Sequence, residues 1–134
     1  MKQSSVYLAV DLGATSGRVM AGIWLADSET LDLEVVNRFP TSTTKINGNL
    51  HWDILGIFNS IKEGLREAAC LYGDRIESIG VDSWGVDYAL IDSNGTMLGN
   101  PYHYRDSRTD GMQLEVQKRV SKEEIYSETG IQFL

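Results

Sequence analysis

The stretch from Asp11 to Arg18 carries residue types that suit a nucleotide phosphate, and it lies between two β-prone segments. Its glycines let backbone amides turn toward an anion, while its hydroxyls and its arginine add further donors. The residues expected at the phosphates are Gly13, Ala14, Thr15, Ser16, Gly17 and Arg18. Asp11, at the end of the first apolar run, is placed to hold a hydrated Mg²⁺ ion. The alternative is an ordinary hairpin turn that begins with an Asx turn.

A second group of candidate residues follows the apolar run Ile76 to Val81. Two carboxylates, Asp82 and Asp87, flank a tryptophan and a glycine there. Strand ends in α/β sheets commonly deliver ligand-binding groups, and Trp84 offers a platform for the apolar face of a sugar. The alternative is a hairpin in which Trp84 is part of the core.

A third segment, Tyr102 to Arg108, is dense in hydrogen-bonding side chains. Arg105, Asp106 and Arg108 could bind a polyhydroxylated ligand or pair with each other. His103 could act as an acid or a base, although the spacing shows no partner for it. A salt-bridged corner of the surface is the alternative.

The elements that must position these residues begin with three short β-prone runs, Val6 to Val10, Gly17 to Leu25 and Leu31 to Phe39. Because only turns separate them, they predict an antiparallel meander. The Thr- and Asn-rich stretch from Pro40 to Asn49 is typical of an exposed loop, and His51 and Trp52 are expected at the start of a helix.

A long helix is predicted from Ile54 to Tyr72, with Asp53 as its N-cap and Gly73 just after its end. Apolar residues recur there at helical spacing and predict the buried face. These are Ile54, Ile57, Phe58, Ile61, Leu65, Ala68, Ala69 and Tyr72.

Two further strands are expected, Ile76 to Val81 and Val86 to Ile91, the second ending in a hairpin turn at Asp92 to Gly95. Helical patterns follow Asp110. Ser121 to Glu124 has capping-box spacing, with Gly130 as a stop. The predicted order is β-β-β-α-β-β and then helices, an α/β class with a mixed sheet. The apolar, uncapped ending at Leu134 indicates part of a larger domain.

Composition restricts the function classes. The chain has 134 residues, 42% of them hydrophobic, and a formal net charge of −7. It is therefore a globular chain of one-domain size, and its acidic balance argues against nucleic acid or an anionic membrane as a partner. Cys70 is the single cysteine, which excludes an intrachain disulfide and favours a reducing, cytoplasmic setting.

Together these segments resemble the N-terminal part of the FGGY carbohydrate kinase family. The phosphate loop of that family has the form Asp-x-Gly-x-x-Ser-x-Arg, and it stands here as Asp11, Gly13, Ser16 and Arg18. The other matching segments are His51-Trp52-Asp53, Ile79 to Tyr88, Tyr104 to Thr109, Ile125-Tyr126 and Gly130 to Leu134. The segments around Trp84 and Arg105 are more specific than the phosphate loop.

The resemblance implies an actin-like, RNase-H-like ATPase fold with a ligand cleft between two lobes. Residues 1–134 would form the first half of the N-terminal, sugar-binding lobe, with the second lobe absent and the remainder of the kinase chain as a partner. Ala14 to Arg18 would lie at the phosphates and Asp11 at the metal. Trp84, Gly85 and Asp106 would contact the sugar, although Asp106 could instead only fix its loop.

The implied reaction is ATP-dependent phosphorylation of L-rhamnulose to L-rhamnulose 1-phosphate, with Mg²⁺. The general base of the family is an Asp downstream of this segment, so no catalytic residue is expected here. Two alternatives stay open: a family kinase for xylulose, gluconate or fuculose, and a non-metabolic actin-like ATP-binding domain.

Overall fold

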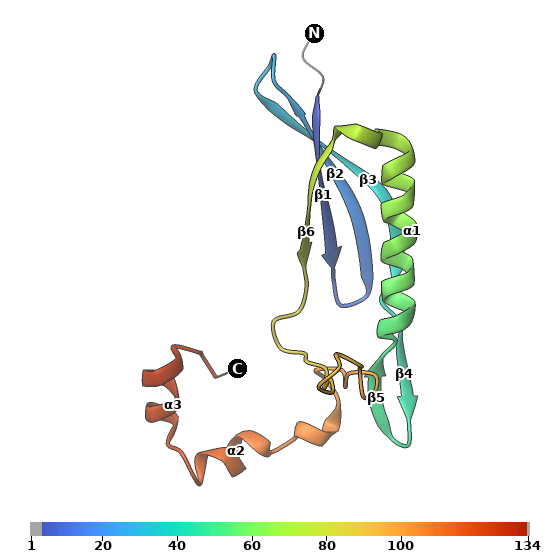
Figure 1. Ribbon diagram of the computed structural model, residues 1–134. Coiled ribbons are helices and arrows are strands. Elements are labelled where there is room, and N and C mark those ends of the chain that lie inside the picture. The colour runs from blue at the N-terminus through green and yellow to red at the C-terminus, as the bar shows by residue number, and fades with distance from the viewer. Residues whose placement is uncertain (1–3, 134) are drawn as a thin grey trace.

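The computed structural model describes residues 4–133; Leu134, in the apolar ending discussed above, lies outside the described residues. Its main sheet has the strand order β3-β2-β1-β6 (Figure 1). These strands are β1 (Ser5–Leu12), β2 (Ser16–Leu25), β3 (Thr30–Pro40) and β6 (Ile76–Asp82). β1, β2 and β3 pair antiparallel, whereas β6 pairs parallel to β1. The predicted meander and mixed sheet are confirmed.

Helix α1 (Ile54–Tyr72) lies along one face of this sheet and supplies the crossover that makes β6 parallel to β1 (Figure 1). The carboxylate of Asp53 accepts the amide N–H of Gly56 at 3.1 Å, so Asp53 is the N-cap. Gly73 has a φ of +54°, which only glycine adopts without strain. The predicted boundaries of the helix are therefore confirmed.

The core lies between α1 and the sheet. In β1 the buried residues alternate with less buried ones, so Val6, Leu8, Val10 and Leu12 face α1. They pack with residues from β2, β3, α1 and the segment just before α1, which are Val19, Ala21, Phe39, Trp52, Ile57, Ala68 and Tyr72. Phe58 and Ala69, predicted on the buried face, are exposed instead, because they lie at the edge of the helix surface that meets the sheet.

A two-stranded hairpin replaces the loop that was predicted before α1. β4 (Thr43–Ile46) pairs antiparallel with β5 (Asn49–Trp52). Asn47 and Gly48 join them with positive φ values, the geometry that a two-residue hairpin turn requires. His51 and Trp52 are therefore strand residues, and their prediction as the start of the helix was wrong.

Val86 to Ile91 does not form the predicted strand. Only an isolated bridge, Ile91 to Met97, occurs there, closed by the predicted turn at residues 92–95. A strand needs a neighbour with which to exchange hydrogen bonds, and residues 86–90 have no ladder partner within residues 4–133.

The last part of the chain lies apart from the sheet (Figure 1). It contains the 3₁₀ helix η2 (Ser107–Thr109), α2 (Met112–Gln117) and α3 (Lys122–Thr129); η1 (Gly73–Arg75) lies earlier, after α1. Ser121 caps α3 by accepting the Glu124 amide N–H, and Gly130 ends it with a φ of +66°, as predicted. Within residues 4–133, no helix is both long and apolar enough to span a bilayer.

Candidate functional site

The loop between β1 and β2 is held from within and from the end of β3. The amide of Gly13 donates to the Ser16 carbonyl at 3.0 Å. Thr41, which is buried, donates its hydroxyl to the Gly13 carbonyl at 3.0 Å and its amide to the Thr15 carbonyl at 3.3 Å. These bonds fix the path of the loop before any ligand arrives.

The donors that remain free on this loop are fewer than the glycine content suggested. The Gly13 amide is used within the turn, and Gly17 lies inside β2, where a side chain would overlap the Phe39 ring. Ala14 and Thr15 are exposed, and their amides have no partner among residues 4–133. The free backbone donors for an anion are therefore those of Ala14 and Thr15, together with the nearby hydroxyls.

Asp11 and Arg18 face each other across β1 and β2 and form an ion pair. The sequence predicts separate roles for them, Asp11 at a metal ion and Arg18 at the phosphates. It does not predict that the two side chains pair with each other. Both side chains are more than a third exposed, so a ligand can reach them. Asp82 is the parallel neighbour of Asp11 on β6, which places Arg18, Asp11 and Asp82 in one row across the sheet.

This row fits a hydrated magnesium ion and a phosphate. Magnesium is normally bound through one or two carboxylates, with water and substrate phosphate completing the shell. Asp11 and Asp82 supply hard oxygen donors at the end of the sheet, and Arg18 supplies a phosphate-binding cation. The Nε of Arg18 is buried without a partner among the described residues.

On the α1 side of the sheet, the aromatic rings of Trp84 and His103 both contact the ring of Trp52. Its ring is fully buried and stacks on Trp84, with centroids 4.1 Å apart and planes 21° apart. His103 contacts the same ring, with centroids 4.2 Å apart. The Nε1–H of Trp52 donates to the carboxylate of Asp87 at 2.7 Å. Trp84 therefore packs on the core through Trp52, which agrees with the alternative that Trp84 is part of the core.

Trp84 also lines a cavity of about 210 Å³ beside the loop. Leu12, which immediately precedes the loop, forms part of the same wall. The Nε1–H of Trp84 is buried and has no acceptor among the described residues. Gly85 follows it, and a Cβ built there meets nothing within 4 Å. The cavity therefore has an aromatic wall, whereas the buried Nε1 atom and Gly85 lie beside it and do not border it.

Asp106 is used to hold its own segment. Its buried carboxylate accepts the amide of Leu50 in β5 at 2.6 Å and the amide of Arg108 at 3.1 Å. The Leu50 amide above all, with the amide and the charge of Arg108, lowers the pKa of Asp106 from its usual value. This arrangement favours the alternative in which Asp106 fixes the loop.

The rest of the third segment also forms internal contacts. His103 is buried, and its Nδ1 accepts the Arg105 amide at 2.9 Å. The Arg105 guanidinium lies over the Tyr104 ring, and that of Arg108 lies over the Tyr102 ring. These contacts agree with a structural corner, in which the Nδ1 atom of His103 is occupied by a backbone amide.

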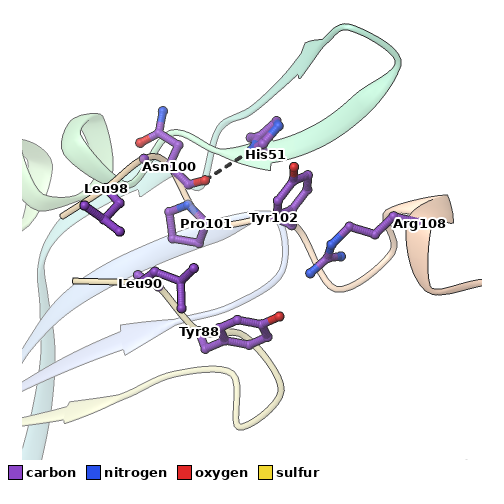
Figure 2. A pocket seen from close by; sticks show the side chains of 10 residues that line it. His51, Tyr88, Leu90, Leu98, Asn100, Pro101, Tyr102 and Arg108 are labelled. Carbon is purple, nitrogen blue, oxygen red and sulfur yellow. Dashed lines mark hydrogen bonds between the residues drawn. The ribbon is translucent and has the colours of Figure 1, made fainter. Parts of the chain in front are cut away.

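A second cavity, of about 340 Å³, shares Tyr88, Ala89 and Pro101 with the first (Figure 2). Figure 2 shows Tyr88, Leu90 and Leu98 around it, with Tyr102 and Arg108 at one end. Although it is larger, it does not include Trp84 or border the phosphate loop. The smaller cavity does both, since Leu12 and Trp84 line it, and it is therefore the candidate ligand site.

Sequence reasoning missed the part played by Trp52. A lone tryptophan before a predicted helix gave no sign that it would be buried under Trp84, 32 positions later. The sequence also singles out Asp87 as one of two carboxylates near Trp84, but it does not predict the hydrogen bond from Trp52 to Asp87. The useful signal was the Asn47-Gly48 pair, which marks a hairpin and would have placed Trp52 on a strand.

Comparison with known families gives a match over almost the whole chain. Residues 6–134 match the N-terminal domain of the FGGY family of carbohydrate kinases. A rhamnulokinase of Mannheimia succiniciproducens is 47% identical over 126 residues, which cover 94% of this chain. A rhamnulokinase of Enterobacter sp. (strain 638) is 46% identical over 127 residues, or 95% of the chain. The chain spans 26% of the length of each of these two relatives.

Solved structures share the fold. A gluconate kinase from Lactobacillus acidophilus superposes with a TM-score of 0.72 at 15% identity, over 96% of this chain and 25% of that one. A Plasmodium falciparum glycerol kinase with ADP superposes with a TM-score of 0.70 at 18% identity, over 98% and 26%. At such identities the likeness concerns the fold alone, and it confirms the expected actin-like α/β fold.

Proposed function

The chain belongs to the FGGY family of carbohydrate kinases, and we propose that the full-length protein phosphorylates L-rhamnulose at its 1-hydroxyl, using ATP. Residues 1–134 would then form the first half of its sugar-binding lobe. The observation that carries this proposal is the high identity to two relatives named rhamnulokinase, which includes the segment from Asp82 to Tyr88 in the overlap. Family membership leaves other sugar kinases of the same family as the alternative.

The loop geometry supports a division of roles between the two faces of the sheet. Asp11 alternates with the buried Val10 and Leu12, so the Asp11–Arg18 pair lies on the face opposite α1. The cavity of Trp84 lies on the α1 side, with Leu12 in its wall. The loop between them would hold the transferred phosphate between nucleotide and sugar.

In this proposal the phosphates lie against Ala14 to Arg18. The free amides of Ala14 and Thr15 and the hydroxyls of Thr15 and Ser16 donate to phosphate oxygens, and Arg18 adds a charge-assisted bond. Asp11 would hold Mg²⁺, which supplies neutralisation of phosphate charge when bound. Arg18 contacts Asp11 through Nη2 alone, so its other N–H groups would donate to phosphate while the ion pair keeps Asp11 next to the phosphate.

The sugar would lie in the smaller cavity, with the indole face of Trp84 covering the apolar side of the ring. Gly85 follows Trp84 outside the lining of this cavity, and we propose that its lack of a side chain leaves room for a part of the sugar that extends beyond the cavity. Asp106 is a weaker candidate contact because its carboxylate already accepts two amides. We propose no general base among these residues.

A panel of ketoses assayed with the full-length enzyme tests the substrate. ATP consumption should rise most with L-rhamnulose and less with xylulose, fuculose or gluconate. A higher kcat/KM for any of the other sugars would replace rhamnulose as the substrate while leaving the kinase assignment in place. No stimulation by any sugar would overturn the proposed function.

Two substitutions in the same enzyme test the phosphate site. Arg18→Ala removes a charge-assisted bond of about 1.5–3 kcal/mol, and we expect kcat/KM for ATP to fall by roughly 10- to 150-fold. Asp11→Asn keeps the shape but removes the charge that holds the metal, and it should lower turnover with little effect on sugar affinity. Matched controls are Arg66→Ala and Asp32→Asn, which change exposed residues away from the loop. Normal sugar-dependent turnover in Asp11→Asn would contradict the assignment.

A further inference from the structure

The indole ring of Trp84 forms part of the wall of the cavity assigned to the sugar. Its Nε1 atom is buried and has no partner within the described residues, so no hydrogen bond of its own fixes this ring. The ring can serve as a flat wall for a sugar only if other contacts hold it in one plane.

The plane of Trp84 is set by the ring beneath it. Trp52 stacks on Trp84 with centroids 4.1 Å apart, and its own ring is 1% exposed. A buried ring with close neighbours has little freedom to rotate. The fixed ring of Trp52 therefore sets the plane of the Trp84 ring that stacks on it.

Trp52 is in turn held by Asp87. The 2.7 Å bond from Nε1 of Trp52 to the Asp87 carboxylate joins the end of β5 to the segment after β6, 35 positions apart. A bond to a charged acceptor is stronger than one between neutral groups and also directional. Asp87 itself lines the same cavity, close to Trp84.

We infer that Asp87 is a positioning residue for the sugar site: its carboxylate fixes Trp52, and Trp52 fixes the indole of Trp84 as the wall against which the sugar packs. This inference rests on the proposed function, because it needs a sugar in the cavity. It assigns no chemical step to Asp87. It explains why a carboxylate is placed at a site where an apolar residue would otherwise complete the wall.

The test uses steady-state kinetics of the full-length enzyme with the sugar identified by the ketose panel. Asp87→Ala removes the acceptor and should raise the sugar KM by about tenfold, while the KM for ATP stays within about twofold. Asp87→Asn keeps an oxygen acceptor and should restore the sugar KM to within about threefold of the parent. Trp84→Phe keeps a ring but replaces the indole wall by a smaller one, and should raise the sugar KM by about tenfold.

Trp24→Phe is the matched control, since Trp24 lies on β2 and lines neither cavity. Its sugar KM should equal that of the parent. Trp52→Phe combined with Asp87→Ala should be no worse than the more affected single variant, because both delete the same hydrogen bond. Additive losses would overturn the inference that the two residues act through one contact.

The outcomes separate this inference from the proposed function. A parent enzyme that no sugar stimulates would overturn both. A sugar-dependent parent with an unchanged sugar KM in Asp87→Ala would overturn only the positioning role. If Asp87→Ala fails to fold, Trp52→Phe decides instead, because it removes the same bond with a smaller change; an unchanged sugar KM there contradicts the inference, and a raised one supports it.

Discussion

Gly85 and Gly17 are glycines for different physical reasons. At Gly17 a Cβ would overlap the Phe39 ring, so the absence of a side chain is a packing requirement of the core. At Gly85 a Cβ would meet nothing within 4 Å, and φ does not require glycine there. No contact or backbone angle among the described residues requires glycine at position 85, and under the proposed function its lack of a side chain leaves room beside Trp84.

We therefore expect Gly85→Val to raise the sugar KM of the full-length enzyme by about tenfold, with the free energy of unfolding changed by less than about 0.5 kcal/mol. Gly17→Ala should do the reverse and cost about 1–3 kcal/mol of stability through overpacking. Kinetics and thermal melts on both variants check this. If Gly85→Val loses as much stability as Gly17→Ala, Gly85 has a structural role and not a role in sugar binding.

Asp106 should make the stability of this corner depend on pH. Because hydrogen bonds to its charged form lower its pKa in the folded state, its contribution is complete above the unfolded pKa of about 4. The contribution is lost as pH falls through the lower, folded-state pKa. The Leu50 amide is the main partner that loses a charged acceptor.

Asp106→Asn should therefore melt at a lower temperature than the parent at pH 7, and the difference between the two should shrink as pH falls below about 4. Thermal melts of both proteins across this range measure it. Asp110→Asn, at the exposed end of the same segment, is the control. A difference that stays constant with pH would mean that the charge of Asp106 contributes nothing.

Among the elements, the contact of α1 with the sheet depends on Gly64. This residue is buried in the middle of the helix, and a Cβ there would lie 2.5 Å from Cγ2 of Val19 and 3.0 Å from Cβ of Asn37. Glycine lowers helix stability, but here it lets α1 approach β2 and β3 closely. The close approach buries Val19 completely.

Gly64→Ala should accordingly destabilise the protein by about 1–2 kcal/mol, because the overlap with Val19 outweighs the better helix propensity of alanine. Denaturant unfolding measures the change. Glu63→Ala, which is exposed on the same turn, should stay within about 0.5 kcal/mol of the parent. A stabilised Gly64→Ala variant would show that the helix can shift to make room.

At the scale of the whole molecule, the chain has one covered and one open face of its sheet. Tyr7, Leu31, Leu33 and Val35 are 45–67% exposed on the face opposite α1. On the α1 side, Ile79 and Val81 are also exposed, because α1 covers the other strands and not β6. Sheets with apolar residues on both faces normally have a layer on each.

Residues 1–134 alone should not show ATP turnover that rises with added sugar. Phosphoryl transfer depends on positioning and charge stabilisation, and the two relatives named rhamnulokinase are about four times as long as this chain. A coupled assay with ADP as the readout, run beside the full-length enzyme, measures this. Sugar-stimulated turnover by the 134-residue chain would show that its own residues are sufficient.

Local chemistry determined much of this protein. The long helix could be predicted from its cap, its apolar spacing and Gly73, because each of these acts within a few residues. The meander followed from short polar connections between β-prone runs, and the turn at Asp92 to Gly95 from its residue types. The glycines, hydroxyls and basic residue of Asp11 to Arg18 predict a phosphate loop, and that role stays a prediction.

Contacts between distant segments were decided only by the tertiary structure. Asp11 pairs with Arg18 because strand register places them opposite each other, and Asp106 accepts the Leu50 amide from 56 positions away. The stack of Trp52 on Trp84 and its bond to Asp87 depend on how β5 meets the segment after β6. Val86 to Ile91 has strand propensity but no ladder partner. Propensity and spacing act along the chain, whereas register and packing are set by which elements meet.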